Sequence, residues 1–124
     1  MVSDGIPADL RDFITKCIDS VGQLEALLLL RDSADEAWGV AALAKRLYVN
    51  EAEATAILIH LVGQGLVGQQ DGLYRYVRQS EQAATIDRLA EAYARQLIPI
   101  TNLIHAKPRR IRAFADAFKI KRDK

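Results

Sequence analysis

The sequence predicts a mainly α-helical fold with one small β-hairpin. Apolar residues recur at steps of three and four in successive segments between residues 7 and 65, and again from residue 80, which is the period of amphipathic helices. Between residues 66 and 77 the period changes to two around the pair Asp71-Gly72, a strong signal for a β-hairpin. The length of 124 residues, half of them hydrophobic, fits one compact domain with an appendage.

Two helices are expected first, over residues 7–18 and 20–31. Pro7 stands where a helix can begin, and Ser20 is a suitable N-cap for the second helix. The four consecutive leucines at 27–30 should be deeply buried. The apolar face of the first helix comprises Leu10, Phe13, Ile14 and Cys17.

Two further helices are expected around a tight turn. After the polar loop "DSADEA", Trp38 predicts a short strand, and the segment "VAALAKRLYV" (40–49) returns to a helical pattern. Asn50 is a good N-cap for the next helix, and Glu51 and Glu53 lie at its positive end. The pattern of that helix ends at Gly63–Gly65, and its buried face is expected to consist of Ala54, Ile57, Leu58 and Leu61.

The hairpin register follows from a two-residue loop at Asp71-Gly72. This loop pairs Gln70 with Leu73, Gln69 with Tyr74, Val67 with Tyr76, and Leu66 with Val77. Val67, Tyr74 and Tyr76 then lie on one face of the hairpin.

Residues 80–106 predict a long amphipathic helix. Ser80 can cap it, and Pro99 should kink or divide it around Ile98 because proline lacks a backbone donor. One small domain would not cover so long an apolar stripe, which favours pairing with a second copy. The alternative is packing against residues 7–31 of the same chain. The expected dimer interface consists of Ile86, Leu89, Tyr93, Leu97 and Ile100.

The charge is distributed unevenly along the chain. Residues 1–106 contain 9 Lys/Arg and 14 Asp/Glu, whereas residues 107–124 contain 8 and 2. The last segment, "KPRRIRAFADAFKIKRDK", predicts a basic amphipathic helix that binds nucleic acid or, as a weaker possibility, an anionic membrane surface. The alternative is a final helix that packs Ile111, Phe114 and Phe118 into the core and ends in a solvated tail.

Several classes of protein and site are not indicated. No apolar run is long enough for a membrane span, and the first residues lack the pattern of a signal peptide. The single cysteine, Cys17, fits a reducing cytoplasm. "GQGLVG" (63–68) matches a dinucleotide motif but ends a helix instead of opening one. His60 and His105 have no cluster of ligands around them, so we expect no metal, no cofactor and no enzymatic activity.

The segment "VAALAKRLYVNEAEATAILIHLVGQGLV" resembles the winged helix-turn-helix regulators of the MarR and ArsR kind. The resemblance covers roughly residues 20–78: a small residue at Ala44, an apolar position at Val49, the cap Asn50, and "GLV" before the hairpin. It implies a winged helix-turn-helix domain over residues 1–78 and a helical extension over 79–124. It also implies a homodimeric DNA-binding transcriptional regulator whose recognition helix follows Asn50.

One departure from that pattern concerns the expected recognition helix. Its outward positions carry no Arg or Lys, although such helices usually present polar or basic side chains to DNA. Contacts to DNA are therefore expected from this helix, its neighbours and the basic tail: Lys45, Arg46, Thr55, Ile59, His60, Gln64, Gln69, Gln70, Arg75, Arg78, Arg109, Arg110 and Arg112. The alternative is a protein-interaction module that uses Ala56 and Ile59 for docking and the basic tail for an anionic partner.

Overall fold

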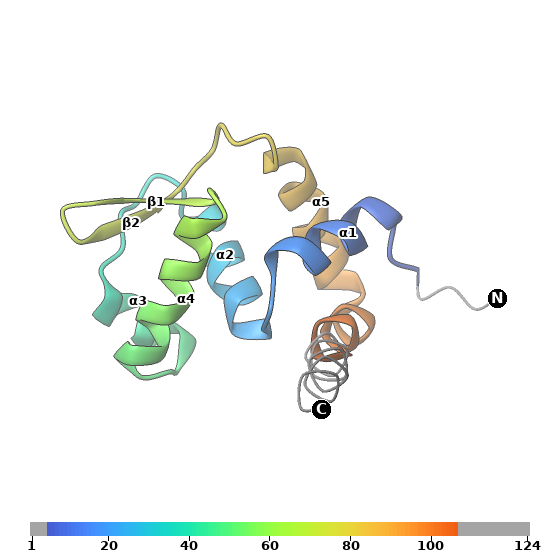
Figure 1. The fold of residues 1–124 in the computed structure, drawn as a ribbon, viewed down its shortest axis with the longest axis horizontal. Coiled ribbons are helices and arrows are strands. Elements are labelled where there is room, and N and C mark those ends of the chain that lie inside the picture. Colours follow the sequence, from blue (N-terminus) through green and yellow to red (C-terminus); the bar gives the residue numbers. More distant parts are fainter. Residues whose placement is uncertain (1–4, 107–124) are drawn as a thin grey trace, which may run out of the picture.

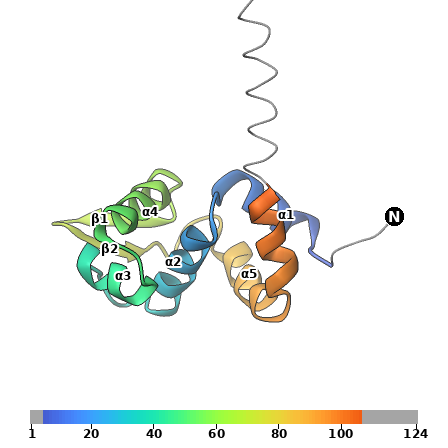
Figure 2. The ribbon, with the colours of Figure 1, turned by 90° about the horizontal axis from the view of Figure 1, so that it is seen from below.

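The computed structural model describes residues 5–106, which form six helices and one two-stranded antiparallel hairpin. Helix α3, helix α4 and the hairpin lie at one end of the molecule, and α1, α5 and a final helical segment over residues 97–106 lie at the other (Figure 1). Helix α2 lies between the two groups in both views (Figure 2). The elements are α1 (Ala8–Cys17), α2 (Val21–Asp32), α3 (Val40–Leu47), α4 (Glu51–Gly63), β1 (Val67–Gln70), β2 (Leu73–Tyr76) and α5 (Ala83–Arg95).

Side-chain caps begin two of the helices, as the sequence predicts. The Ser20 hydroxyl accepts a hydrogen bond from the Gln23 amide at 3.1 Å and starts α2. The Asn50 side chain accepts one from the Glu53 amide at 2.7 Å and starts α4. Each cap satisfies an amide that has no partner within the first turn of its helix.

A tight turn joins α3 to α4. Tyr48 ends α3 in the left-handed conformation, with φ 59° and ψ 42°. The amide of Val49 donates to the carbonyl of Ala44 at 3.0 Å, which closes the end of the helix. Asn50 then begins α4, so only Tyr48 and Val49 separate the last residue of α3 from the cap of α4. The turn holds the two helices packed against each other.

The hairpin has the register that the sequence predicts. Gln70 pairs with Leu73, Gln69 with Tyr74, and Val67 with Tyr76, and the amide of Val77 donates to the carbonyl of Leu66. Asp71 and Gly72 both have positive φ, as a two-residue loop of this kind requires. Trp38 and Tyr74 exchange backbone hydrogen bonds of 2.7 and 2.8 Å, which attaches the segment before α3 to β2.

One hydrophobic core includes side chains from both ends of the molecule. It combines the buried face of α4, the leucines of α2 and the buried tyrosines of β2 with apolar residues of α1, α5 and residues 97–106. Val67, Tyr74 and Tyr76 share the buried face of the hairpin. The core side of α4 consists of Ala54, Ile57, Leu58 and Leu61, as expected.

Part of the apolar stripe after residue 80 is covered by the chain itself. Ile86, Leu89 and Ile100 have no exposed surface, and α5 packs against α1. Within one chain these three side chains are already covered, so a second copy would contact other residues of the expected interface, which stays a prediction. Helix α5 instead packs against α1 of the same chain, which is the alternative arrangement.

Two local expectations about this region also need correction. Helix α5 begins after Gln82, not Ser80, and the buried Ser80 hydroxyl has no hydrogen-bond partner among the described residues. The helix is divided near Pro99, but the break lies at Gln96, and Pro99 is the third residue of the segment 97–106. Proline is tolerated there because the first amides of a helix have no intrahelical acceptor.

Among the helices within residues 5–106, none has both the length and the hydrophobicity of a membrane-spanning helix.

Candidate nucleic-acid interface

The outer face of α4 presents small and apolar side chains. Ala52, Ala56, Ile59 and Gly63 are exposed, and the helical period places them opposite the four residues that α4 buries. Ile59 keeps 62 % of its surface exposed. The middle of this face therefore has no side chain that can donate or accept a hydrogen bond.

Polar groups occupy the margins of the same helix. Glu51 and Glu53 are exposed in the first turn, where their charge interacts favourably with the helix dipole. Thr55 is half-buried, and Gln64 is exposed at the C-cap. The side chains available for hydrogen bonds to a base edge are thus few, and two of them are acidic.

His60 has a partner within the protein. Its side chain is 21 % exposed, and its Nε2 atom lies 2.6 Å from the carbonyl oxygen of Cys17. Because a carbonyl only accepts, Nε2 carries the hydrogen in this contact. The Nδ1 atom lies 3.8 Å from a carboxylate oxygen of Asp19. His60 links α4 to the segment between α1 and α2, which makes it a poor candidate for a DNA contact.

Positive charge near α4 comes from α3 and β2. Lys45, Arg46 and Arg75 are exposed and, within the part of the chain that the structure describes, form no ion pair with a carboxylate. The Arg46 guanidinium lies 5.5 Å from the centre of the Trp38 ring, a cation–π contact that leaves its charge unneutralised. Arg78, which was expected to contact DNA, pairs with Asp35.

Most other basic side chains near the opposite end are paired. Lys16 lies 3.1 Å from Asp12, and Arg95 lies 3.1 Å from Glu91. Two longer-range pairs attach α5 to the N-terminal helices, namely Arg31 with Asp87 at 2.8 Å and Arg88 with Asp9. Exposed pairs of this kind contribute little to stability, but they reduce the positive charge that this end presents.

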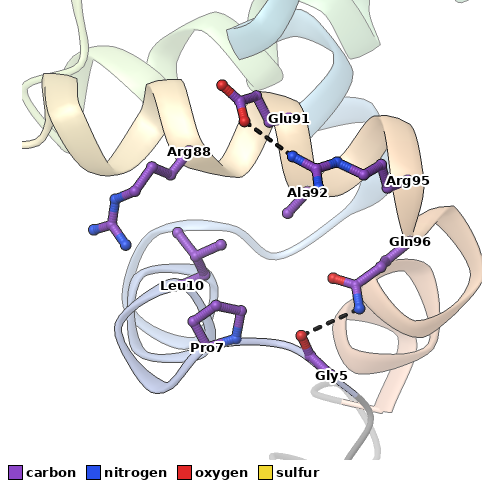
Figure 3. A pocket seen from close by; sticks show the side chains of 8 residues that line it. All are labelled: Gly5, Pro7, Leu10, Arg88, Glu91, Ala92, Arg95 and Gln96. Atoms are coloured by element: carbon purple, nitrogen blue, oxygen red, sulfur yellow. Dashed lines mark hydrogen bonds and ion pairs between the residues drawn. The ribbon is translucent and has the colours of Figure 1, made fainter.

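A cleft of about 400 Å³ lies between α1 and α5. Leu10, Pro7 and Ala92 form its apolar part (Figure 3). The charged and amide groups around it already have partners: Arg95 pairs with Glu91, Arg88 with Asp9, and the Gln96 amide donates to the Gly5 carbonyl at 3.1 Å. Because these groups are satisfied by the protein, the cleft offers a ligand little polar recognition.

The residues predicted for DNA contacts fall into three groups. The exposed side chains on α3, α4 and the hairpin lie at one end of the molecule (Figure 1): Lys45, Arg46, Ile59, Gln64, Gln69, Gln70 and Arg75. Thr55, His60 and Arg78 are half-buried or paired, as described above. Arg109, Arg110 and Arg112 lie outside the described residues. Tyr48, which is 94 % exposed, is not among the predicted residues, because nothing in the sequence pattern distinguishes a tyrosine in a turn from a packed one.

Two of the residues predicted for the dimer interface, Leu97 and Tyr93, keep exposed surface. Leu97 is 52 % exposed, and its neighbour Ile98 is 68 % exposed. Tyr93 is half-buried, and its hydroxyl donates to Glu25 at 2.9 Å. Burial and this hydrogen bond to a carboxylate raise the pKa of Tyr93 to about 12.

Within residues 5–106, no three His, Cys, Asp or Glu side chains lie together in an arrangement that could hold a metal ion. No family model, no curated protein and no solved structure matches this chain.

Proposed function

We propose that this chain is a homodimeric DNA-binding transcriptional regulator with a winged helix-turn-helix domain. The order α3, tight turn, α4 and hairpin supports this proposal, with α4 as the recognition helix and the hairpin as the wing. The observation that carries it is the position of the basic side chains that form no ion pair among residues 5–106. Lys45 and Arg46 precede α4, and Arg75 follows it on the hairpin.

Basic side chains beside a recognition helix are suited to contacts with DNA phosphates. Phosphate contacts supply much of the affinity of a protein for DNA and fix its orientation on the duplex. Lys45, Arg46 and Arg75 are suited to this role because no carboxylate of the described chain competes for them. By its sequence, the segment 107–124 adds further positive charge.

The test is duplex binding as a function of salt. A fluorescent duplex of about 30 base pairs, three turns of B-DNA, is titrated with the full chain at several salt concentrations. The slope of log K against log salt should be negative, and Lys45→Ala and Arg75→Ala should each make it shallower by about 1. The matched controls are Lys16→Ala and Arg95→Ala, which remove basic side chains that form ion pairs at the opposite end of the molecule. Absence of binding at low salt would refute the proposal. Equal changes of the salt slope in all four variants would show that Lys45 and Arg75 have no special role in binding.

A protein-interaction module is the second candidate, because exposed apolar surface favours it. Ile59 and Tyr48 are largely exposed, and Glu51 and Glu53 add negative charge to α4. Tyrosine and large apolar side chains are typical of the centres of protein interfaces. Failure to bind DNA, combined with a partner contact that is lost in Ile59→Asp, would favour this function.

The proposed homodimer uses the exposed part of the interface first expected, since Ile86, Leu89 and Ile100 are covered within one chain. Leu97 and Ile98 are consecutive, exposed and apolar, and they begin the segment 97–106. A dimer is expected because regulators of this kind bind two half-sites through paired subunits. We propose that the contact with a second copy lies at Leu97 and Ile98 because these apolar side chains are exposed.

A further inference from the structure

The outer face of α4 restricts what this helix is able to recognise in DNA. A base pair offers hydrogen-bond donors, hydrogen-bond acceptors and, at thymine alone, a methyl group in the major groove. Ala52, Ala56 and Ile59, which lie along the middle of the exposed face, offer only methyl and methylene groups. Hydrogen-bond recognition from the middle of this face is therefore excluded by its chemistry.

A second observation favours a DNA duplex as the occupant of this apolar face. Two basic side chains form no ion pair within residues 5–106: Lys45 on α3, which packs against α4, and Arg75 on β2, whose partner strand β1 packs against α4. A protein partner with an apolar surface would not require this positive charge, whereas a polyanion with apolar groups in its groove does. Duplex DNA that contains thymine has both features.

We propose that α4 recognises the C5-methyl groups of thymine through Ala52, Ala56 and Ile59. This inference rests on the proposed DNA binding and specifies its substrate as duplexes with thymines in the contacted major groove. The small side chains at 52 and 56 let the helix backbone approach the base edges closely, and Ile59 supplies the largest apolar contact. Lys45 and Arg75 contribute affinity that is independent of sequence.

The experiment changes methyl groups without changing hydrogen bonds. Four duplexes of equal length are compared by fluorescence anisotropy at one low salt concentration: alternating A·T, alternating A·U, alternating G·C, and alternating G·C with 5-methylcytosine. The A·T duplex should bind more tightly than the A·U duplex by about fourfold for each methyl group that becomes buried. Methylation of the cytosines should tighten binding to the G·C duplex in the same direction.

Two variants assign the effect to α4. Ile59→Ala should reduce the preference for methylated duplexes and leave the salt dependence unchanged, since Ile59 carries no charge. Thr15→Ala is the matched control, because Thr15 is exposed and uncharged but lies on α1 at the other end of the molecule, and it should leave the preference intact. Both side chains are exposed, so neither substitution should unfold the protein.

The possible results distinguish thymine recognition by α4 from DNA binding in general. Salt-dependent binding of equal strength to all four duplexes would overturn thymine recognition and leave DNA binding standing. A methyl preference that survives in Ile59→Ala would overturn the assignment to α4. No binding to any duplex would overturn both proposals.

Discussion

The replacement of Leu89 by alanine tests whether α5 belongs to the core of a single chain. Leu89 has no exposed surface in one copy of the protein. The substitution removes three carbon atoms, which corresponds to roughly 2–3 kcal/mol of lost burial, and the cavity that remains brings the expected loss to about 2–5 kcal/mol. A domain of this size has a total stability of roughly 5–15 kcal/mol, so the variant should fold but unfold at much lower urea concentration.

Urea denaturation followed by circular dichroism measures this change. The experiment is run at two protein concentrations, because a core side chain destabilises the protein equally at both, whereas an interface side chain has an effect that depends on concentration. Leu73→Ala is the control: it is the same substitution on β2, at a side chain that is 44 % exposed, and it should cost much less. Equal losses in the two variants, or a loss in Leu89→Ala that changes with concentration, would refute the packing described here.

Three further predictions follow from other surfaces of the molecule. Leu97→Glu with Ile98→Glu should shift sedimentation from dimer to monomer without loss of helical content; a wild-type protein that sediments as a monomer at tens of micromolar contradicts the dimer. Tyr48→Gly should stabilise the protein by about 0.5–1 kcal/mol, because it relieves the left-handed strain at an exposed side chain, while Tyr48→Ala should bring no such gain. Since the pKa of Tyr93 is raised from 10.0 to about 12, the folded state holds the phenol proton more tightly than the unfolded state does. Wild type should therefore lose stability relative to Tyr93→Phe as the pH rises from 10.0 to about 12, and parallel pH profiles would contradict this.

Features governed by neighbouring residues could be predicted from the sequence. The hairpin register follows from Asp71-Gly72 because a two-residue loop permits one pairing of its flanks. The caps at Ser20 and Asn50 follow from side chains that bond an amide three residues later. The helical period likewise indicates which face of α4 is buried.

Features that depend on distant residues could not be predicted in the same way. The period after residue 80 shows that Ile86 and Leu89 are buried, but it does not show whether α1 or a second copy buries them. His60 lies at the edge of the exposed face of α4 by its period, yet its ring reaches the carbonyl of Cys17, which is 43 residues away in the sequence. The same holds for the candidate interface, since only the fold shows that Arg78 is paired while Lys45 and Arg75 form no ion pair within the described part of the chain.

The contact between Arg46 and the Trp38 ring has a spectroscopic consequence. Trp38 is the one tryptophan in the sequence, and it is half-buried where the segment before α3 joins β2. A guanidinium held 5.5 Å from the centre of an indole is positioned to influence its excited state. Displacement of Arg46 towards a phosphate would therefore change the intrinsic fluorescence, so that Trp38 serves as an unlabelled optical probe of events at the end of the molecule that contains α3, α4 and the hairpin.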